Sequence, residues 1–262
     1  MTHTPPAWDP LQYSRFERER DRAAHDLLAR LPDGRAPTEV WDLGCGTGQH
    51  AVRLKRRWPD ARVHGLDSSA AMLEQARARD EDVDWRLGDI SGWVPDRPAD
   101  LILANASLHW LPDHEVLLRR LTDGLAPGGV IAVQMPMAHE TRHHTLMREV
   151  AAEGPWAAAL AGVETIAPLL EPERYYAVLA GACVEIDIWA TTYLQALTGP
   201  DAVLEWMKGT ALRPFLAALP DEVTRKAFLD ALGERLSSAF PRRPDGTTLM
   251  PFPRLFLVAR KR

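Results

Sequence analysis

The chain has 262 residues, a formal net charge of −5 at pH 7 and 46% apolar residues. This length and apolar content suffice for one large domain with a buried core, and the negative charge argues against general nucleic-acid binding. The two cysteines, Cys45 and Cys183, are too few for a disulfide framework or a zinc site. We therefore expect a cytoplasmic protein without a metal. The sequence shows neither a signal peptide at its start nor an apolar stretch long enough to span a bilayer.

The first half of the chain alternates between short apolar runs and amphipathic segments. Residues 13–32 predict a helix that ends at Pro32. Strands are then predicted at residues 38–44, 61–67, 83–90, 99–106 and 129–136. Helices are predicted at residues 49–58, 68–80 and 113–125, the second with Ser68 or Ser69 as its N-cap. This order is typical of an α/β fold with a mainly parallel sheet and helices on both faces.

The second half is less regular. Prolines interrupt a helical region at residues 139–180, two or three helices are predicted at 200–240, and strands are predicted at 184–197 and 251–262, which makes seven strands. We expect a single domain over residues 1–262. Its predicted parts are an N-terminal helical lid (1–32), a ligand-binding core (33–137), and a remainder (138–262) with a helical cap inserted at about 198–240. The cap would cover the sheet edge beyond the carboxyl ends of the strands.

The stretch "WDLGCGTGQH", residues 41–50, places three glycines in a turn between the first strand and a helix. It differs from the dinucleotide fingerprint because Gln49 occupies the last glycine position, and no Gly-Lys-Ser/Thr follows to make a phosphate-binding loop. About twenty residues later Asp67 ends the second strand, where a carboxylate can accept from ribose hydroxyls. Asp89 ends the third strand, and Asn105 the fourth.

Residues 38–137 resemble the S-adenosylmethionine-dependent methyltransferases of the Rossmann-like class I. The resemblance implies that Asp42 and the glycines Gly44, Gly46 and Gly48 lie at the methionine end of that cofactor. It implies Asp67 at the ribose and Asp89 with Ile90 at the adenine. The other implied cofactor contacts are Cys45, Ser68, Met72, Asn105, Ala106 and Arg20. Cys45 is interpreted as a small residue that fits the turn, because no basic partner stands beside it to activate a thiol.

Two arginines lie in apolar surroundings, Arg213 in "TALRPFL" and Arg254 in "PFPRLFL". A guanidinium binds carboxylates through two parallel hydrogen bonds, so these residues are candidates for holding an anionic methyl acceptor. A carboxylate is ionised near neutral pH and needs no base before it accepts a methyl group. We therefore expect no catalytic acid or base and assign none to His109. Alternatively, Arg213 is a solvated charge at a helix end.

Several segments resemble the trans-aconitate 2-methyltransferase family nearly from end to end. They are "WDPLQYSRFERER", "NASLHWLPDH", "LMREVA", "VEIDIWATTY", "LRPFL" and "FPRLFLVAR". The resemblance implies a methyl ester formed on one carboxylate of trans-aconitate, and an N-terminal helix with Tyr13, Phe16 and Arg20 that closes over the site. The implied acceptor residues are Tyr13, Tyr175, Tyr176, Tyr193, Arg213 and Arg254. Tyr175 and Tyr176 could also be core residues.

Two other functions stay open from the sequence. The acceptor could be another small acid, a malonyl group on an acyl carrier or a quinone precursor, or the chain could bind the cofactor without catalysis. We expect a small tricarboxylate substrate as partner, with neither nucleic acid nor membrane. The sequence does not indicate an oligomeric state.

Overall fold

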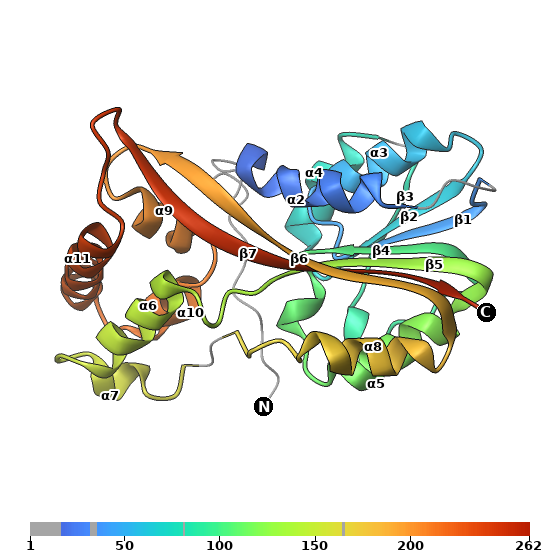
Figure 1. The fold of residues 1–262 in the computed structure, drawn as a ribbon. Coiled ribbons are helices and arrows are strands. Elements are labelled where there is room, and N and C mark those ends of the chain that lie inside the picture. The colour runs from blue at the N-terminus through green and yellow to red at the C-terminus, as the bar shows by residue number, and fades with distance from the viewer. Residues whose placement is uncertain (1–16, 32–35, 81, 164–165) are drawn as a thin grey trace. The chain divides into compact units, whose positions relative to one another are not determined.

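The computed structural model describes residues 17–31, 36–80, 82–163 and 166–262, with the backbone alone for 17–20. It contains one seven-stranded sheet in the order β3-β2-β1-β4-β5-β7-β6 (Figure 1). The strands are β1 (Glu39–Leu43), β2 (Arg62–Asp67), β3 (Asp84–Leu87), β4 (Ala99–Asn105), β5 (Leu125–Pro136), β6 (Cys183–Thr198) and β7 (Thr247–Lys261). The pairs among β1 to β5 are parallel and β7 runs antiparallel to β5. The predicted fold class, with seven mostly parallel strands, is confirmed.

The chain divides into two compact units. The sheet unit contains Arg20–Pro136, Leu169–Thr191 and Arg254–Arg262, and the helical unit contains Met137–Pro168 and Thr192–Pro253. Strands β6 and β7 are neighbours in the sheet, and each contributes residues to both units. The lid, core and cap boundaries drawn from the sequence remain a prediction.

Helices cover both faces of the sheet unit. They are α2 (Glu17–Ala29), α3 (Gln49–Arg57), α4 (Ala70–Arg77), α5 (His114–Asp123) and α8 (Pro172–Ala180). In Figure 1, α2, α3 and α4 lie on one side of the sheet and α5 and α8 on the other. Coverage on both sides explains why all five residues of β1 are buried and why the strands read as apolar runs. At the start of α4 the Ser69 hydroxyl accepts from the Met72 amide at 3.4 Å, the predicted N-cap.

The helical unit has an apolar core of its own. Its helices are α6 (Arg142–Ala152), α7 (Ala157–Leu160), α9 (Ala202–Lys208), α10 (Arg213–Ala218) and α11 (Glu222–Ala239). Side chains from all of these helices meet in one buried cluster, which includes Met147, Leu160, Trp206, Phe215, Phe228 and Leu232. Within it the Trp156 ring meets Phe228 edge to face at 5.4 Å. None of the helices in the described residues is both long and apolar enough to cross a membrane.

Candidate active site

The glycine turn lies at the carboxyl end of β1 and is fixed to the end of β2. The backbone amides of Gly44 and Cys45 both donate to the Leu66 carbonyl, at 2.7 and 3.0 Å. All three loop glycines have positive φ angles of 54 to 82°. A Cβ on Gly44 would lie 2.3 Å from the Ser107 Cβ, whereas one on Gly46 would meet no heavy atom within 4 Å. The turn therefore presents an open surface at Gly46.

Asp67 holds this turn in place from the end of β2. Its Oδ2 accepts from the Gly46 amide at 2.8 Å, and its Oδ1 accepts from the Ser69 amide at 2.8 Å. Burial raises the pKa of this carboxyl, and the backbone N–H groups partly oppose the rise. Each carboxylate oxygen has a second lone pair, so Asp67 can still accept from hydroxyl groups of a ligand.

Asp42 is the buried acid of the site. It is only 1% exposed, and its Oδ2 has no hydrogen-bond partner within the described part of the chain. Burial raises its pKa to about 7; the Asp67 charge adds to this rise and the Ala51 backbone N–H opposes it. A nearby cation would favour the ionised form, so Asp42 is suited to a positively charged ligand group.

Strand β4 ends in an unusual backbone turn beside the glycine loop. Ala106 has a φ of 53°, and its amide donates to the Gln134 carbonyl at 2.8 Å. Ser107 then donates its hydroxyl to the Leu43 carbonyl at 2.7 Å, which ties β4 to the end of β1. The Asn105 side-chain nitrogen lies 3.2 Å from His50 Nε2. Its Oδ1 is buried and has no hydrogen-bond partner among the described residues.

The remaining predicted cofactor residues differ in their exposure. Asp89 is exposed and caps a short 3₁₀ turn, η1 (Ile90–Gly92), by accepting from the Ser91 amide at 2.8 Å. Ile90 and Met72 are buried, while Ser68 is exposed. Burial, with the nearby Asp42 and Asp67 charges, raises the pKa of the Cys45 thiol above its usual range. The thiol therefore stays protonated and is not a nucleophile.

Arg254 lies at the same edge of the sheet as the glycine turn. In the ladder between β5 and β7 it stands opposite Pro136, the last residue of β5. Two residues earlier in β5, Gln134 pairs with Asn105 of β4. Arg254 is 4% exposed, so its charge is withdrawn from solvent. A buried guanidinium at this edge can pair with an anion that approaches the carboxyl ends of the strands.

The structure does not gather all the predicted acceptor residues into one described site. Tyr193 and Arg213 belong to the helical unit, whereas Arg254, Tyr175 and Tyr176 belong to the sheet unit. Tyr13 and Phe16 lie outside the described residues, and only the backbone of Arg20 is described. The other two tyrosines lie on α8 with opposite exposure.

Tyr175 is completely buried, while Tyr176 is 55% exposed. The Tyr175 hydroxyl lies 2.5 Å from His114 Nδ1 and accepts from the Leu170 amide at 3.3 Å. Burial raises the pKa of this hydroxyl to about 12. These contacts join α8 to α5 and make Tyr175 part of the packing of the sheet unit.

Three residues that shape the site were not identified from the sequence. Ser107 packs on Gly44, and His50 contacts Asn105. The ring of Trp85 in β3 fills the space that a Cβ would need at both Gly48 and Gly65, with contacts of 2.4 Å in each case. Gly65 in the middle of β2 was the available signal, since a strand-interior glycine indicates close approach by another group.

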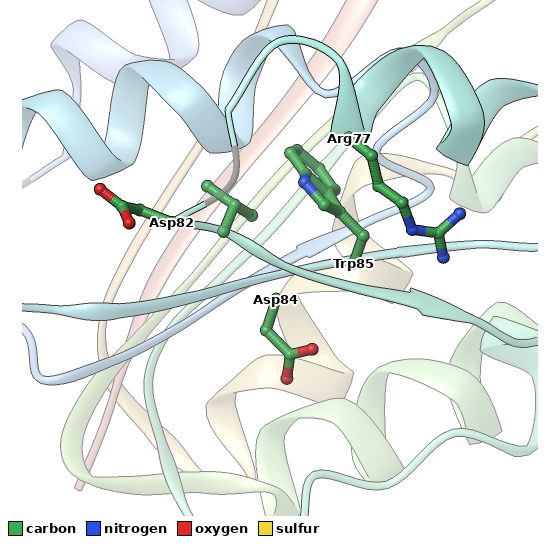
Figure 2. A pocket seen from close by; sticks show the side chains of 5 residues that line it. Arg77, Asp82, Asp84 and Trp85 are labelled. Carbon is green, nitrogen blue, oxygen red and sulfur yellow. The ribbon is translucent and has the colours of Figure 1, made fainter.

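A shallow groove of about 570 Å³ lies elsewhere, beside α4 and β3. Figure 2 shows Arg77, Asp82, Asp84 and Trp85 lining it, with Asp84 and Trp85 on opposite sides of the strand. Its lining includes the first residues of β3, whereas the glycine turn and Arg254 lie at the carboxyl ends of parallel strands. The groove is therefore not part of the candidate site.

Comparisons with known proteins agree with this geometry. Residues 40–129 match the family described as "Methyltransferase domain". Among solved structures, YcgJ from Bacillus subtilis superposes with a TM-score of 0.59 at 14% identity, covering 91% of this chain and 99% of that one. A phosphoethanolamine N-methyltransferase from Haemonchus contortus, in complex with S-adenosylhomocysteine, has a TM-score of 0.55 at 16% identity, covering 90% and 52%.

Closer relatives extend over nearly the whole chain. A trans-aconitate 2-methyltransferase from Azoarcus is 49% identical over 254 residues, 97% of this chain and 99% of the relative. A trans-aconitate 2-methyltransferase from Methylobacterium radiotolerans is 50% identical over 257 residues, 97% of this chain and 98% of the relative.

The sheet order, the glycine turn and the matching domain define a methyltransferase with the class I, Rossmann-like fold. The full-length relatives narrow this class to one family. The chain belongs to the trans-aconitate 2-methyltransferases.

Proposed function

We propose that the protein transfers a methyl group from S-adenosyl-L-methionine to one carboxylate of trans-aconitate, giving a monomethyl ester and S-adenosyl-L-homocysteine. Membership of the trans-aconitate 2-methyltransferase family is the observation that supports this most directly. The small tricarboxylate is the expected partner. The cytoplasmic location stays a prediction.

The residues at the first turn of the sheet fit this cofactor. Asp42 and Asn105 each keep a buried oxygen without a partner in the described chain, which suits a ligand that carries a charged ammonium group. Asp67 has free lone pairs for ribose hydroxyls, and the open space at Gly46 lets a ligand approach the backbone closely. The side chains of Asp42, Asn105 and Asp67 offer acceptors to a ligand, as expected for a cofactor without phosphate.

The protein's own part in the reaction is positioning. The bound cofactor would supply an electrophilic methyl group on a sulfonium centre. A carboxylate acceptor is already ionised, so no side chain has to remove a proton. Arg254 would hold the acceptor carboxylate at the sheet edge, which limits its motion and replaces its hydration. Arg213 and Tyr193 are proposed as further acceptor contacts from the helical unit.

The substrate claim is tested by incubating the protein with methyl-labelled cofactor and a panel of di- and tricarboxylates. We expect labelled ester from trans-aconitate at a higher kcat/KM than from any other acid. Ester formed only from other acids would overturn the substrate while keeping the reaction type. Cofactor binding without turnover on any acid would overturn catalysis.

The role of Arg254 has a matched control on its own strand. Arg254→Ala should weaken acceptor binding by about 2–5 kcal/mol, because one partner of a buried charge pair is lost. Arg260→Ala removes a partly exposed arginine of β7 that pairs with Glu185, and it should leave the KM for the acceptor unchanged. Equal KM values in both variants would remove Arg254 from the acceptor site. Cofactor affinity, measured by calorimetry, should be unaffected in either protein.

A further inference from the structure

Two buried oxygens without partners face the same side of the sheet. Asp42 of β1 stands opposite Leu103 of β4, so Asn105, two residues further on, projects to the same face as Asp42. Neither Asp42 Oδ2 nor Asn105 Oδ1 has a hydrogen-bond partner among the described residues. Both atoms are acceptors, so the complementary ligand group must donate, and the buried carboxylate favours one with positive charge.

His50 contacts Asn105 from helix α3. Its Nε2 lies 3.2 Å from Asn105 Nδ2, so the ring nitrogen accepts a hydrogen bond from the side-chain amide. The amide oxygen then points away from His50. Burial, with the charges of Arg53 and His25, lowers the pKa of His50 to about 4, while Asp21 opposes the change. The ring is therefore neutral near pH 7, and its Nε2 is free to accept.

This arrangement is costly for the protein alone. With Nε2 as acceptor, the proton of the neutral ring is on Nδ1, which is buried and has no partner in the described chain. A buried donor and a buried acceptor, each unsatisfied, lower the stability of the folded state. The hydrogen bond between His50 and Asn105 is therefore better explained by the acceptor oxygen that it presents to a ligand than by a contribution to the stability of the fold.

We propose that His50 is a positioning residue that fixes the orientation of the Asn105 amide, so that its oxygen and Asp42 together accept from the α-ammonium group of the cofactor. This inference rests on the proposed function, because it assigns a role within the same cofactor site. His50 acts through its hydrogen bond to Asn105. In the absence of the Nε2 acceptor, the amide would be free to turn its nitrogen toward the ligand, and a donor would then face a cation.

The test compares two ligands that differ in the amino-acid part. S-adenosylhomocysteine carries the ammonium group, and 5′-methylthioadenosine has the same adenosine and sulfur without it. Calorimetry on the full chain should show that His50→Leu weakens the binding of S-adenosylhomocysteine about 10-fold. This is the loss expected for one hydrogen bond to a charged group. The same variant should bind 5′-methylthioadenosine within about twofold of the wild type. Asn105→Ala should behave alike, and the double variant should lose no more than either single one.

Two further variants keep the test decisive. His50→Gln offers an amide oxygen as acceptor and should restore most of the S-adenosylhomocysteine affinity, even if His50→Leu folds poorly. Arg56→Leu introduces the same side chain at an exposed residue of α3, the helix that carries His50, and should change neither affinity. Equal losses for both ligands, or additive losses in the double variant, would overturn the positioning role. Failure of the wild type to bind either ligand would instead overturn the proposed function and this inference with it.

Discussion

At the scale of single residues, the three glycines of the first turn differ in the reason why a side chain is excluded. Gly44 faces Ser107, and Gly48 faces Trp85, so the protein's own packing excludes a side chain at both. Gly46 has open space around it. The sequence motif treats the three positions alike, and only the contacts made by β3 and β4 distinguish them.

Gly44→Ala is therefore expected to destabilise the fold by about 2–4 kcal/mol, since it combines the left-handed backbone with a clash against Ser107. Gly128→Ala is the matched control: its φ is 77°, close to the 74° of Gly44, but a Cβ there meets nothing within 4 Å. It should lose only about 1 kcal/mol. Urea unfolding measures both, and equal losses would contradict the steric explanation.

The positions of Asp42, Asp67 and Asn105 could be predicted from the sequence, because each lies at or next to the end of a strand and the carboxyl ends of parallel strands share one edge. The supporting contacts could not be predicted. Ser107 reaches Leu43 from 64 residues away, and the role of Trp85 depends on how β3 lies beside β2.

At the scale of elements, apolar runs and turn signals were sufficient for all seven strands, and they predicted two or three helices between residues 200 and 240, where the structure has three. The division of β6 and β7 between two units could not be predicted, because each strand reads as one continuous run. The contact between α5 and α8 was equally hidden. It depends on a hydrogen bond between side chains 61 residues apart, His114 and Tyr175.

Tyr175→Phe tests whether that bond holds α8 in place. Removing the hydroxyl leaves His114 Nδ1 and the Leu170 amide without their partner, so we expect a loss of about 1–2 kcal/mol in unfolding free energy. Tyr176→Phe, at the exposed neighbour, should change stability little. If Tyr175 is instead an acceptor residue, the KM for trans-aconitate will rise while stability stays the same.

At the scale of the whole molecule, strands β6 and β7 connect the two units without interruption. Each of these strands is one continuous element with residues in both units, so unfolding one unit is expected to disturb the strands of the other. We therefore expect a single calorimetric transition, with equal van't Hoff and calorimetric enthalpies. Two resolved transitions would show that the units are stable independently.

Buried histidines should make the whole molecule sensitive to acid. Burial lowers the pKa of His143 to about 3 and that of His144 to about 4, mainly because both lie in the apolar core of the helical unit. The unfolded chain binds protons at these residues from about pH 6.5, and the folded chain does not. Stability therefore falls as the pH drops from about 6.5 towards 4, by about 1.4 kcal/mol per pH unit for each histidine.

Asp42 acts in the opposite direction, because its raised pKa lets the folded state keep a proton below about pH 7. The histidines outnumber it, so the net slope should still be destabilising in acid. Urea unfolding between pH 6 and 4.5 should show that slope, and His143→Leu should reduce it by about 1.4 kcal/mol per pH unit. An unchanged slope in this variant would contradict the assignment, and the exposed His25→Leu serves as the reference.

Because the space around Gly46 is open, a side chain at this position could block cofactor binding without disturbing the packing of the fold. Asparagine tolerates a left-handed backbone, and its own amide could still donate to Asp67, so a chain with asparagine at this position should remain intact. Its side chain would occupy the approach reserved for the methyl donor. Such a variant would be folded but unable to transfer methyl groups. Expressed in a cell in place of the active enzyme, it would separate the effects of the protein's presence from the effects of its catalysis.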